Sequence, residues 1–346
     1  MLPNDPHKVS PRKARRQFLE DKRNRLVYSS FRVYKAPTRH FVQYCENHGI
    51  HTMGAVTRGV VNDWKRNRET DEIAPATFKS NVKHVKTFLT WCYRNEVLAD
   101  PISEMVENPT VNGEDVSKDW YTRDRAEIIL DYLDTYEYAS RNHTHFALLW
   151  SIGSRVSGSL ALDLGDIEWN PADPNVPDGY AILKIRHRPE TGTRLKNKED
   201  SERNVTISAE MADLLRDYID GRRIDVTDEN GREPLFTTEH GRLQRQRAYK
   251  NFTGLSRPCV YDNQCPHDRD IDECEAALKR YASKCPSSKA LHAIRHGSVT
   301  NHLNDGWDME TLSVRVDMSI EVMKKHYDKR TLEDKRKKTN KYLHLL

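Results

Sequence analysis

The sequence predicts a mainly α-helical protein with a small β-sheet, divided into an all-helical domain and a larger mixed α+β domain. In the first third of the chain, apolar residues recur at the i, i+3, i+4, i+7 spacing that buries one face of a helix. Two segments near the middle, 180–187 and 204–207, instead alternate apolar and polar residues as strands do. With 346 residues, the chain is long enough for two domains that each have a hydrophobic core.

The N-terminal domain is expected to span residues 30–101, after a polar and basic tail at residues 1–29. Its most regular helix begins near Pro75, where proline is tolerated because the first helical N–H groups lack a partner within the helix. The helix ends near Asn95, and one face carries Phe78, Val82, Val85, Phe88, Leu89 and Cys92. Residues 102–120 are polar with several small residues, so we expect a linker there.

The second domain is expected to span residues 121–346, including a basic C-terminal tail. Helical spacing is found at 123–139, and an apolar helix is expected at 145–152. The alternating segments 180–187 and 204–207 are separated by polar, turn-rich residues. This arrangement predicts a β-hairpin with a long basic tip.

The charge distribution points to a polyanionic partner. The net charge of +4 is small, but residues 1–40 contain eleven Lys or Arg against three acids, and residues 324–341 contain nine against three. Basic ends on a nearly balanced chain favour binding to nucleic acid, although a solvated charged surface has the same composition.

Membrane and secreted classes are not expected. No apolar run approaches the roughly 20 residues that cross a bilayer, and the first residues lack the pattern of a signal peptide. Charged residues make up 31% of the chain, and the mean hydropathy is −0.85. We therefore expect a soluble, cytoplasmic protein with no membrane partner.

A candidate anion site lies in the last sixth of the chain. His292 and Arg295 are spaced so that both side chains lie on one face of a helix, and Tyr327 follows in a lysine-rich segment. A tyrosine hydroxyl, with a pKa of about 10, becomes a useful nucleophile only beside fixed positive charge and hydrogen-bond donors. Arginine supplies both to a phosphate or carboxylate. On these residues alone, a helix with a satisfied histidine and a solvated arginine is the better explanation of the pattern.

Four segments together resemble the tyrosine recombinase (phage integrase) family. SIGSRVSGSLALDLGDI at 151–167 resembles its first conserved box, and the basic hairpin resembles the strand pair that carries an essential lysine. His292-x-x-Arg295-His296 resembles the second box, and residues 317–327 resemble the nucleophile segment. The resemblance covers nearly the whole chain, with 30–101 similar to the family's core-binding domain and the second domain similar to its catalytic domain.

The resemblance implies a site-specific DNA recombinase, or integrase, that cleaves and rejoins double-stranded DNA. Four protomers would assemble on two paired DNA sites, with accessory DNA-binding factors as possible partners. The chemistry would require no cofactor, because the covalent intermediate conserves the energy of the phosphodiester. Two alternatives stay open: a monomeric type IB topoisomerase with the same chemistry, and an inactive DNA-binding relative.

The resemblance also implies residue roles. Arg155 and Arg295 would hold the scissile phosphate, His292 would act as a general acid or base, and Tyr327 would attack to give a 3′-phosphotyrosyl intermediate. Lys198 would protonate the 5′-oxygen that leaves, since it stands five residues before Arg203 as the family lysine often does. Lys196 is the alternative, because it points the same way as Lys198 if the tip continues to alternate.

Two positions depart from the family pattern. The family usually has an acid three residues after the first arginine, where this chain has Gly158. Asp317 is expected in the histidine position of the Leu-Gly-His motif before the nucleophile, and an ionised aspartate cannot donate a proton. Either that role is dispensable or His296 or His326 supplies it. Similar departures occur in archaeal and archaeal-virus members, so the chain is expected to be of that type.

Four of the six cysteines lie in a polar insert at residues 259–285. Clustered cysteines in an intracellular protein bind metal more often than they form disulfides, and four thiolates suit tetrahedral zinc. The sequence lacks the Cys-x-x-Cys spacing of common zinc sites, so reduced thiols and disulfides stay open as alternatives. A structural zinc ion is the expectation, with its ligands Cys259, Cys265, Cys274 and Cys285.

Overall fold

The computed structural model confirms the predicted fold class, which is mainly helical with small β-sheets. The chain divides into two compact units, residues 1–117 and 118–346, which are described separately. The structure describes residues 5, 6, 8–110, 120–327, 336 and 340.

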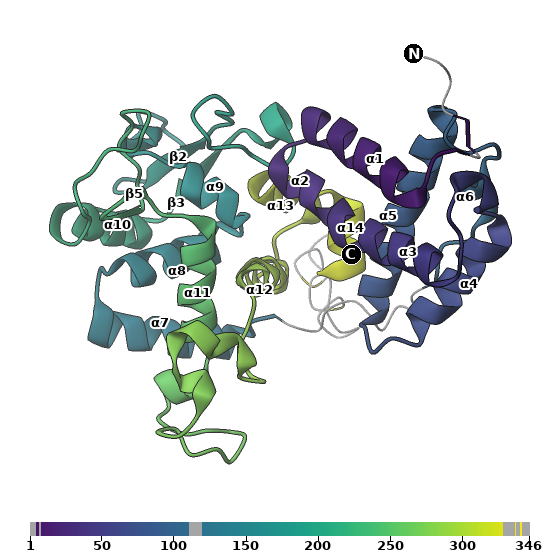
Figure 1. The fold of residues 1–346 in the computed structure, drawn as a ribbon. Coiled ribbons are helices and arrows are strands. Elements are labelled where there is room, and N and C mark those ends of the chain that lie inside the picture. Colours follow the sequence, from purple (N-terminus) through teal and green to yellow (C-terminus); the bar gives the residue numbers. More distant parts are fainter. Residues whose placement is uncertain (1–4, 7, 111–119, 328–335, 337–339, 341–346) are drawn as a thin grey trace. The chain divides into compact units, whose positions relative to one another are not determined.

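The first unit is a helical bundle with an aromatic core (Figure 1). Phe18, Phe41, Trp64 and Phe88 come from four different helices and form edge-to-face and tilted ring pairs. Such pairs stabilise a core beyond the apolar area they bury. The helices are α1 (Pro11–Arg25), α2 (Tyr28–Phe31), η1 (Arg32–Tyr34), α3 (Lys35–Asn47), η2 (Met53–Ala55), α4 (Arg58–Glu69), α5 (Pro75–Arg94) and α6 (Ile102–Met105).

The most regular predicted helix is confirmed as α5, which begins at Pro75 and buries the six apolar side chains that its spacing indicated. The predicted tail at 1–29 is wrong for most of its length. Residues 11–25 form α1, whose N-terminus is capped by the Ser10 side chain and whose Phe18 is fully buried. Seven basic residues obscured this helix in the sequence. The helix buries few apolar side chains, but Ala14 and Phe18 are one turn apart and therefore lie on the same face.

The predicted linker at 102–120 also begins too early. Ile102 and Val106 are buried in the core of the first unit, so the bundle continues through α6. Residues 111–119 lie outside the described part of the chain. In that described part, no helix is long and apolar enough to cross a membrane.

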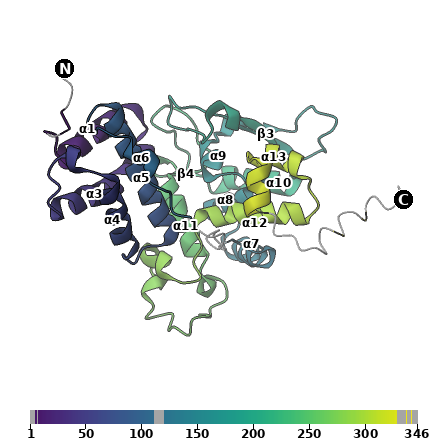
Figure 2. The same ribbon diagram turned by 90° about the vertical axis from the view of Figure 1, so that its right-hand side faces the viewer.

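The second unit packs helices around a three-stranded antiparallel sheet of order β1-β2-β3 (Figure 2). Leu183 of β2 pairs with Ile167 and Val205 on its two neighbours, and all three side chains are buried. The strands are β1 (Ile167–Trp169), β2 (Ala181–Ile185), β3 (Arg203–Ile207), β4 (Thr237–Thr238) and β5 (Gly241–Arg242). The α-helices are α7 (Arg123–Glu137), α8 (Arg141–Ile152), α9 (Val156–Ala161), α10 (Ala209–Gly221), α11 (Arg245–Leu255), α12 (Leu291–Asn304), α13 (Met309–Val316) and α14 (Ile320–His326).

The predicted hairpin is present, but its tip is not a continuation of the strands. An isolated bridge joins Arg188 to Thr193, and the chain then turns into the short 3-10 helix η5 (Lys198–Ser201) before β3 begins. We call residues 186–202 the β2–β3 segment. Alternation cannot be used to decide which way its lysines point.

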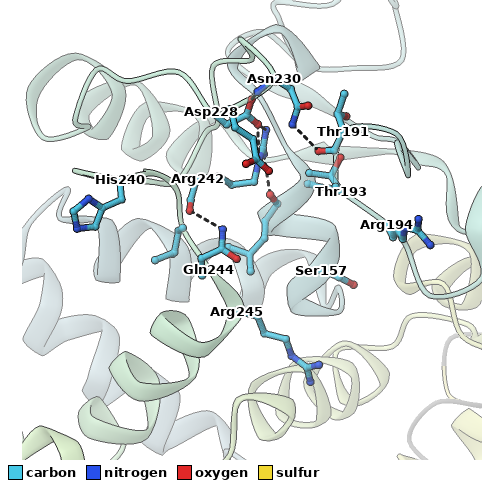
Figure 3. A pocket seen from close by; sticks show the side chains of 15 residues that line it. Ser157, Thr191, Thr193, Arg194, Asp228, Asn230, His240, Arg242, Gln244 and Arg245 are labelled. Atoms are coloured by element: carbon cyan, nitrogen blue, oxygen red, sulfur yellow. Dashed lines mark hydrogen bonds and ion pairs between the residues drawn. The ribbon is translucent and has the colours of Figure 1, made fainter. Parts of the chain in front are cut away.

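The base of the β2–β3 segment is fastened by a largely buried ion network. The Asp163 carboxylate accepts a hydrogen bond from Arg232 at 2.6 Å, and the Asp228 carboxylate accepts one from Arg242 at 2.8 Å. A pocket of about 390 Å³ lies against this network, and Figure 3 shows Asp228 and Arg242 in its wall. His292, Arg295 and Tyr327 are not among the residues that line the pocket.

Removing the central carboxylate of this network should destabilise the second unit strongly. Asp163→Ala leaves the partly buried Arg232 without a carboxylate partner and Arg242 with Asp228 alone, which costs about 3–5 kcal/mol of unfolding free energy. Urea unfolding monitored by circular dichroism would measure this loss of unfolding free energy. Asp213→Ala is the matched control, because the Asp213–Arg216 pair is exposed and should be worth no more than about 1 kcal/mol. Equal losses in the two variants would contradict the assignment.

Candidate active site

Helix α12 carries three of the predicted site residues: His292, Arg295 and His296. Arg295 is only 3% exposed, and its guanidinium donates to the carbonyl oxygens of Gly153 at 2.8 Å and Asp317 at 3.2 Å. It therefore ties the end of α8 to the end of α13. Burial lowers the pKa of Arg295 to about 10, so the guanidinium stays charged at neutral pH.

Arg155 lies three residues after Ile152, the last residue of α8, and directly precedes α9. Its backbone is extended there, at φ −65° and ψ 146°, which directs the chain away from α8. Its guanidinium donates to the carboxylate of Asp317, and its side chain stays 24% exposed. The two arginines, far apart in sequence, thus meet at the same turn after α13, as the resemblance implied.

Tyr327 follows α14 and is nearly buried, at 5% exposure, against Val299 and Leu303 of α12. Its hydroxyl lies 3.2 Å from Nε2 of His292 and also interacts with the Arg295 guanidinium. His292 reaches the surface, but desolvation by the surrounding protein and the positive charge of Arg295 lower its pKa to about 4. At neutral pH the imidazole is uncharged, so its Nε2 can accept the tyrosine proton.

Two further aromatic rings hold the tyrosine in place. His296 stacks on Tyr327 with ring centroids 4.4 Å apart, and Trp120 stacks on His296 at 5.2 Å. Beside Trp120, the backbone of Tyr121 is so close to α12 that a Cβ on Gly297 would lie 2.3 Å from the Tyr121 carbonyl oxygen. Sequence reasoning missed Trp120. Its only signal was a tryptophan at the end of a polar stretch.

The two candidate lysines differ in their relation to this cluster. Both side chains are exposed, but Lys196 is among the positive charges that lower the pKa of His292, whereas Lys198 is not. Lys198 begins η5 with a left-handed backbone, at φ +57°. Proximity to His292 therefore favours Lys196, although the sequence spacing favoured Lys198.

The backbone of Asp317 changes its place in the family motif. Asp317 has φ +52°, the left-handed conformation that glycine adopts most easily. Val316-Asp317-Met318 then corresponds to Leu-Gly-His, with Asp317 in the glycine position and Met318 in the histidine position. A thioether cannot transfer a proton, so this position supplies no acid or base. The backbone angle therefore favours the glycine position for Asp317 over the histidine position that the sequence predicts.

The cysteine insert does not support the predicted zinc site. Cys259, Cys265, Cys274 and Cys285 are all free thiols, and among the described residues no group of three or more His, Cys, Asp or Glu is placed to hold a metal. Arginine–carbonyl contacts fasten the insert instead. The buried Arg257 donates to the carbonyl oxygens of Gly254 and Ala276, and Arg125 donates to that of Ser287. The buried Ala276 and Ala282 add apolar packing to these contacts.

A tyrosine whose hydroxyl meets a neutral histidine, with two arginines beside it, is suited to attack a phosphodiester and hold its charge. The helical first unit and the α+β second unit place these residues in the architecture of tyrosine recombinases. The sequence profile of the Phage integrase family matches residues 119–333. The chain therefore belongs to the phage integrase family and is a tyrosine-type site-specific DNA recombinase.

Individual relatives are distant but cover most of the chain. The tyrosine recombinase XerD of Oceanobacillus iheyensis is 21% identical over 307 residues, 87% of this chain and 88% of XerD. The tyrosine recombinase XerC of Rhodospirillum centenum is 23% identical over 307 residues, 86% of this chain and 75% of XerC.

Solved structures agree on the fold. The Tn1549 transposon integrase in complex with a circular intermediate DNA is similar at a TM-score of 0.67 and 13% identity, covering 97% of this chain and 100% of that one. The XerH recombinase bound to its difH substrate is similar at a TM-score of 0.61 and 15% identity, covering 95% and 84%.

Proposed function

We propose that Tyr327 is the nucleophile that attacks the scissile phosphate of duplex DNA. The observation that carries this proposal is the 3.2 Å contact between its hydroxyl and His292 Nε2, beside two arginines. His292 accepts the tyrosine proton as the oxygen–phosphorus bond forms. Arg155 and Arg295 stabilise the charge that develops on the non-bridging oxygens, and they need little rearrangement because the fold already holds them.

The bond from phosphorus to the 5′-oxygen then breaks, and Lys196 protonates that oxygen. Its electrostatic effect on His292 supports this choice over Lys198. The products are a 3′-phosphotyrosyl enzyme and a free 5′-hydroxyl. Attack by the 5′-hydroxyl of another strand reverses the chemistry and joins the DNA without a cofactor.

Double-stranded DNA is the proposed partner, held mainly through its phosphates. The basic residues of both chain ends support this, and the logarithm of the binding constant should fall with the logarithm of salt by about 0.9 for each phosphate neutralised. By the family resemblance, four protomers act on two paired sites, with accessory DNA-binding factors as possible partners. The enzyme would act on DNA in the cytoplasm, and Gly158 supports an archaeal or archaeal-virus type.

Covalent trapping tests the proposal. Wild-type protein is incubated with a nicked duplex that carries the candidate attachment site, taken from the DNA flanking the gene, and run on a denaturing gel. We expect a protein–DNA adduct through the 3′-phosphate. Nuclease and protease digestion followed by mass spectrometry should place the nucleotide on the peptide that contains Tyr327. Absence of an adduct on DNA that the protein binds would refute the proposed chemistry.

A further inference from the structure

We propose that Asp317 is a positioning residue that fixes Arg155 and the lysine-bearing β2–β3 segment against each other. The proposal rests on the proposed function, because it concerns the same active site. It assigns Asp317 a role different from that of the histidine whose place it was first expected to take.

One carboxylate gathers three donors from separate parts of the second unit. Arg155 donates to it from the start of α9. Ser201 donates at 2.7 Å from the end of η5, and the Asn197 amide donates at 3.2 Å from the residue before η5. Asn197 and Ser201 are also joined to each other, since the Asn197 N–H donates to the Ser201 hydroxyl at 3.2 Å. The carboxylate thus holds a closed turn that directly follows Lys196.

The backbone at Asp317 is strained but firmly held. A side chain in the left-handed region is unfavourable where glycine would be relaxed. The conformation is maintained because Arg295 donates to the Asp317 carbonyl oxygen and the Met318 N–H donates to the carbonyl oxygen of Ser313. Strain retained at a functional site points to a side chain that is needed there.

The Asp317 carboxylate also lies among several positively charged side chains. Arg203 is held nearby through its donation to the Arg315 carbonyl oxygen at 2.9 Å. Burial lowers the pKa of Arg203 to about 10; the charge of Asp317 raises this pKa, and the neighbouring Arg155 and Arg315 lower it further. Asp317 therefore offsets the repulsion among the cations that converge here. Gly158, three residues after Arg155, has no side chain, so Asp317 supplies Arg155 with a carboxylate from another element.

Asp317→Gly tests the proposal cleanly, because glycine removes the carboxylate and relieves the backbone strain. In single-turnover cleavage of a bound nicked duplex, we expect adduct formation about 10- to 100-fold slower, as for a misplaced catalytic group. DNA affinity should not fall, and the melting temperature should fall by less than in Asp163→Ala, because glycine relaxes the left-handed backbone and Arg155 stays partly exposed to solvent. Asp317→Asn, which keeps hydrogen-bonding capacity and tolerates the backbone, should recover part of the rate.

Ser201→Ala separates positioning from other roles. Because its hydroxyl acts through Asp317, the double variant with Asp317→Gly should be no slower than Asp317→Gly alone, whereas independent roles would multiply the losses. An unchanged or faster rate in Asp317→Gly would overturn the proposal, the faster rate meaning that the carboxylate competes with the phosphate. The proposal would also be overturned if the rate losses multiply in the double variant and the melting temperature falls further than in Asp317→Gly alone. Failure of wild type to form an adduct would instead refute the proposed function.

Discussion

Tyr327→Phe should form no covalent adduct with a nicked duplex while binding the same DNA with unchanged affinity. The substitution removes only the hydroxyl that contacts His292. The ring is nearly buried and stacks on His296, and phenylalanine keeps both of these features. The expected loss is complete on a denaturing gel, because phenylalanine has no hydroxyl to attack the phosphate. Gel shifts on the uncleaved duplex measure the affinity.

The control for this experiment is Tyr342→Phe. Tyr342 is the other tyrosine near the end of the sequence, at a position outside the described residues, and it falls well past the nucleophile segment that the family resemblance defines. Its variant should form adduct at the wild-type rate. An adduct that survives in Tyr327→Phe and disappears in Tyr342→Phe would transfer the nucleophile to Tyr342.

Lys196→Ala should slow strand cleavage about 10²- to 10⁴-fold, the usual loss when a general acid is removed. Lys198→Ala should slow it less than about 10-fold, because its influence on the transferred proton would be only indirect. Both lysines are exposed, so neither substitution should change the melting temperature. The measurement is the single-turnover rate of adduct formation on the nicked duplex.

A substrate with sulfur in place of the bridging 5′-oxygen tests directly which of the two lysines protonates the leaving group. A thiolate leaves without needing a proton, so this substrate should restore the rate of Lys196→Ala close to that of wild type. If Lys198→Ala shows the larger loss on ordinary DNA and is the variant that the sulfur substrate rescues, Lys198 is the general acid. Equal small losses in both variants would show that neither lysine protonates the leaving oxygen.

Periodicity and motif order were enough to predict much of this molecule. Helix α5 follows from its apolar spacing, and the pairing of β2 with β3 follows from alternation. The encounter of Arg155 with Arg295 followed from the family resemblance, because both boxes are local sequence patterns.

Other features depend on tertiary contacts that leave little trace in the sequence. Helix α1 buries Ala14 and Phe18 but carries seven basic side chains, so its composition concealed it. The left-handed conformation of Asp317 is imposed by donors from Arg295 and by the end of α13. The closeness of Lys196 to His292 depends on the course of an irregular segment, which alternation could not describe.

The close packing at Gly297 fixes the backbone of Tyr121 against α12, the helix that carries His292 and Arg295. Residues 120 and 121 are the first described residues after the segment that joins the units, and they lie directly on α12. Only a residue without a side chain fits beneath the Tyr121 carbonyl, so the chain is fixed at this point. A side chain at position 297 would push the backbone of Tyr121 away from α12 and, with it, the neighbouring Trp120, whose ring stacks on His296 beside the nucleophile.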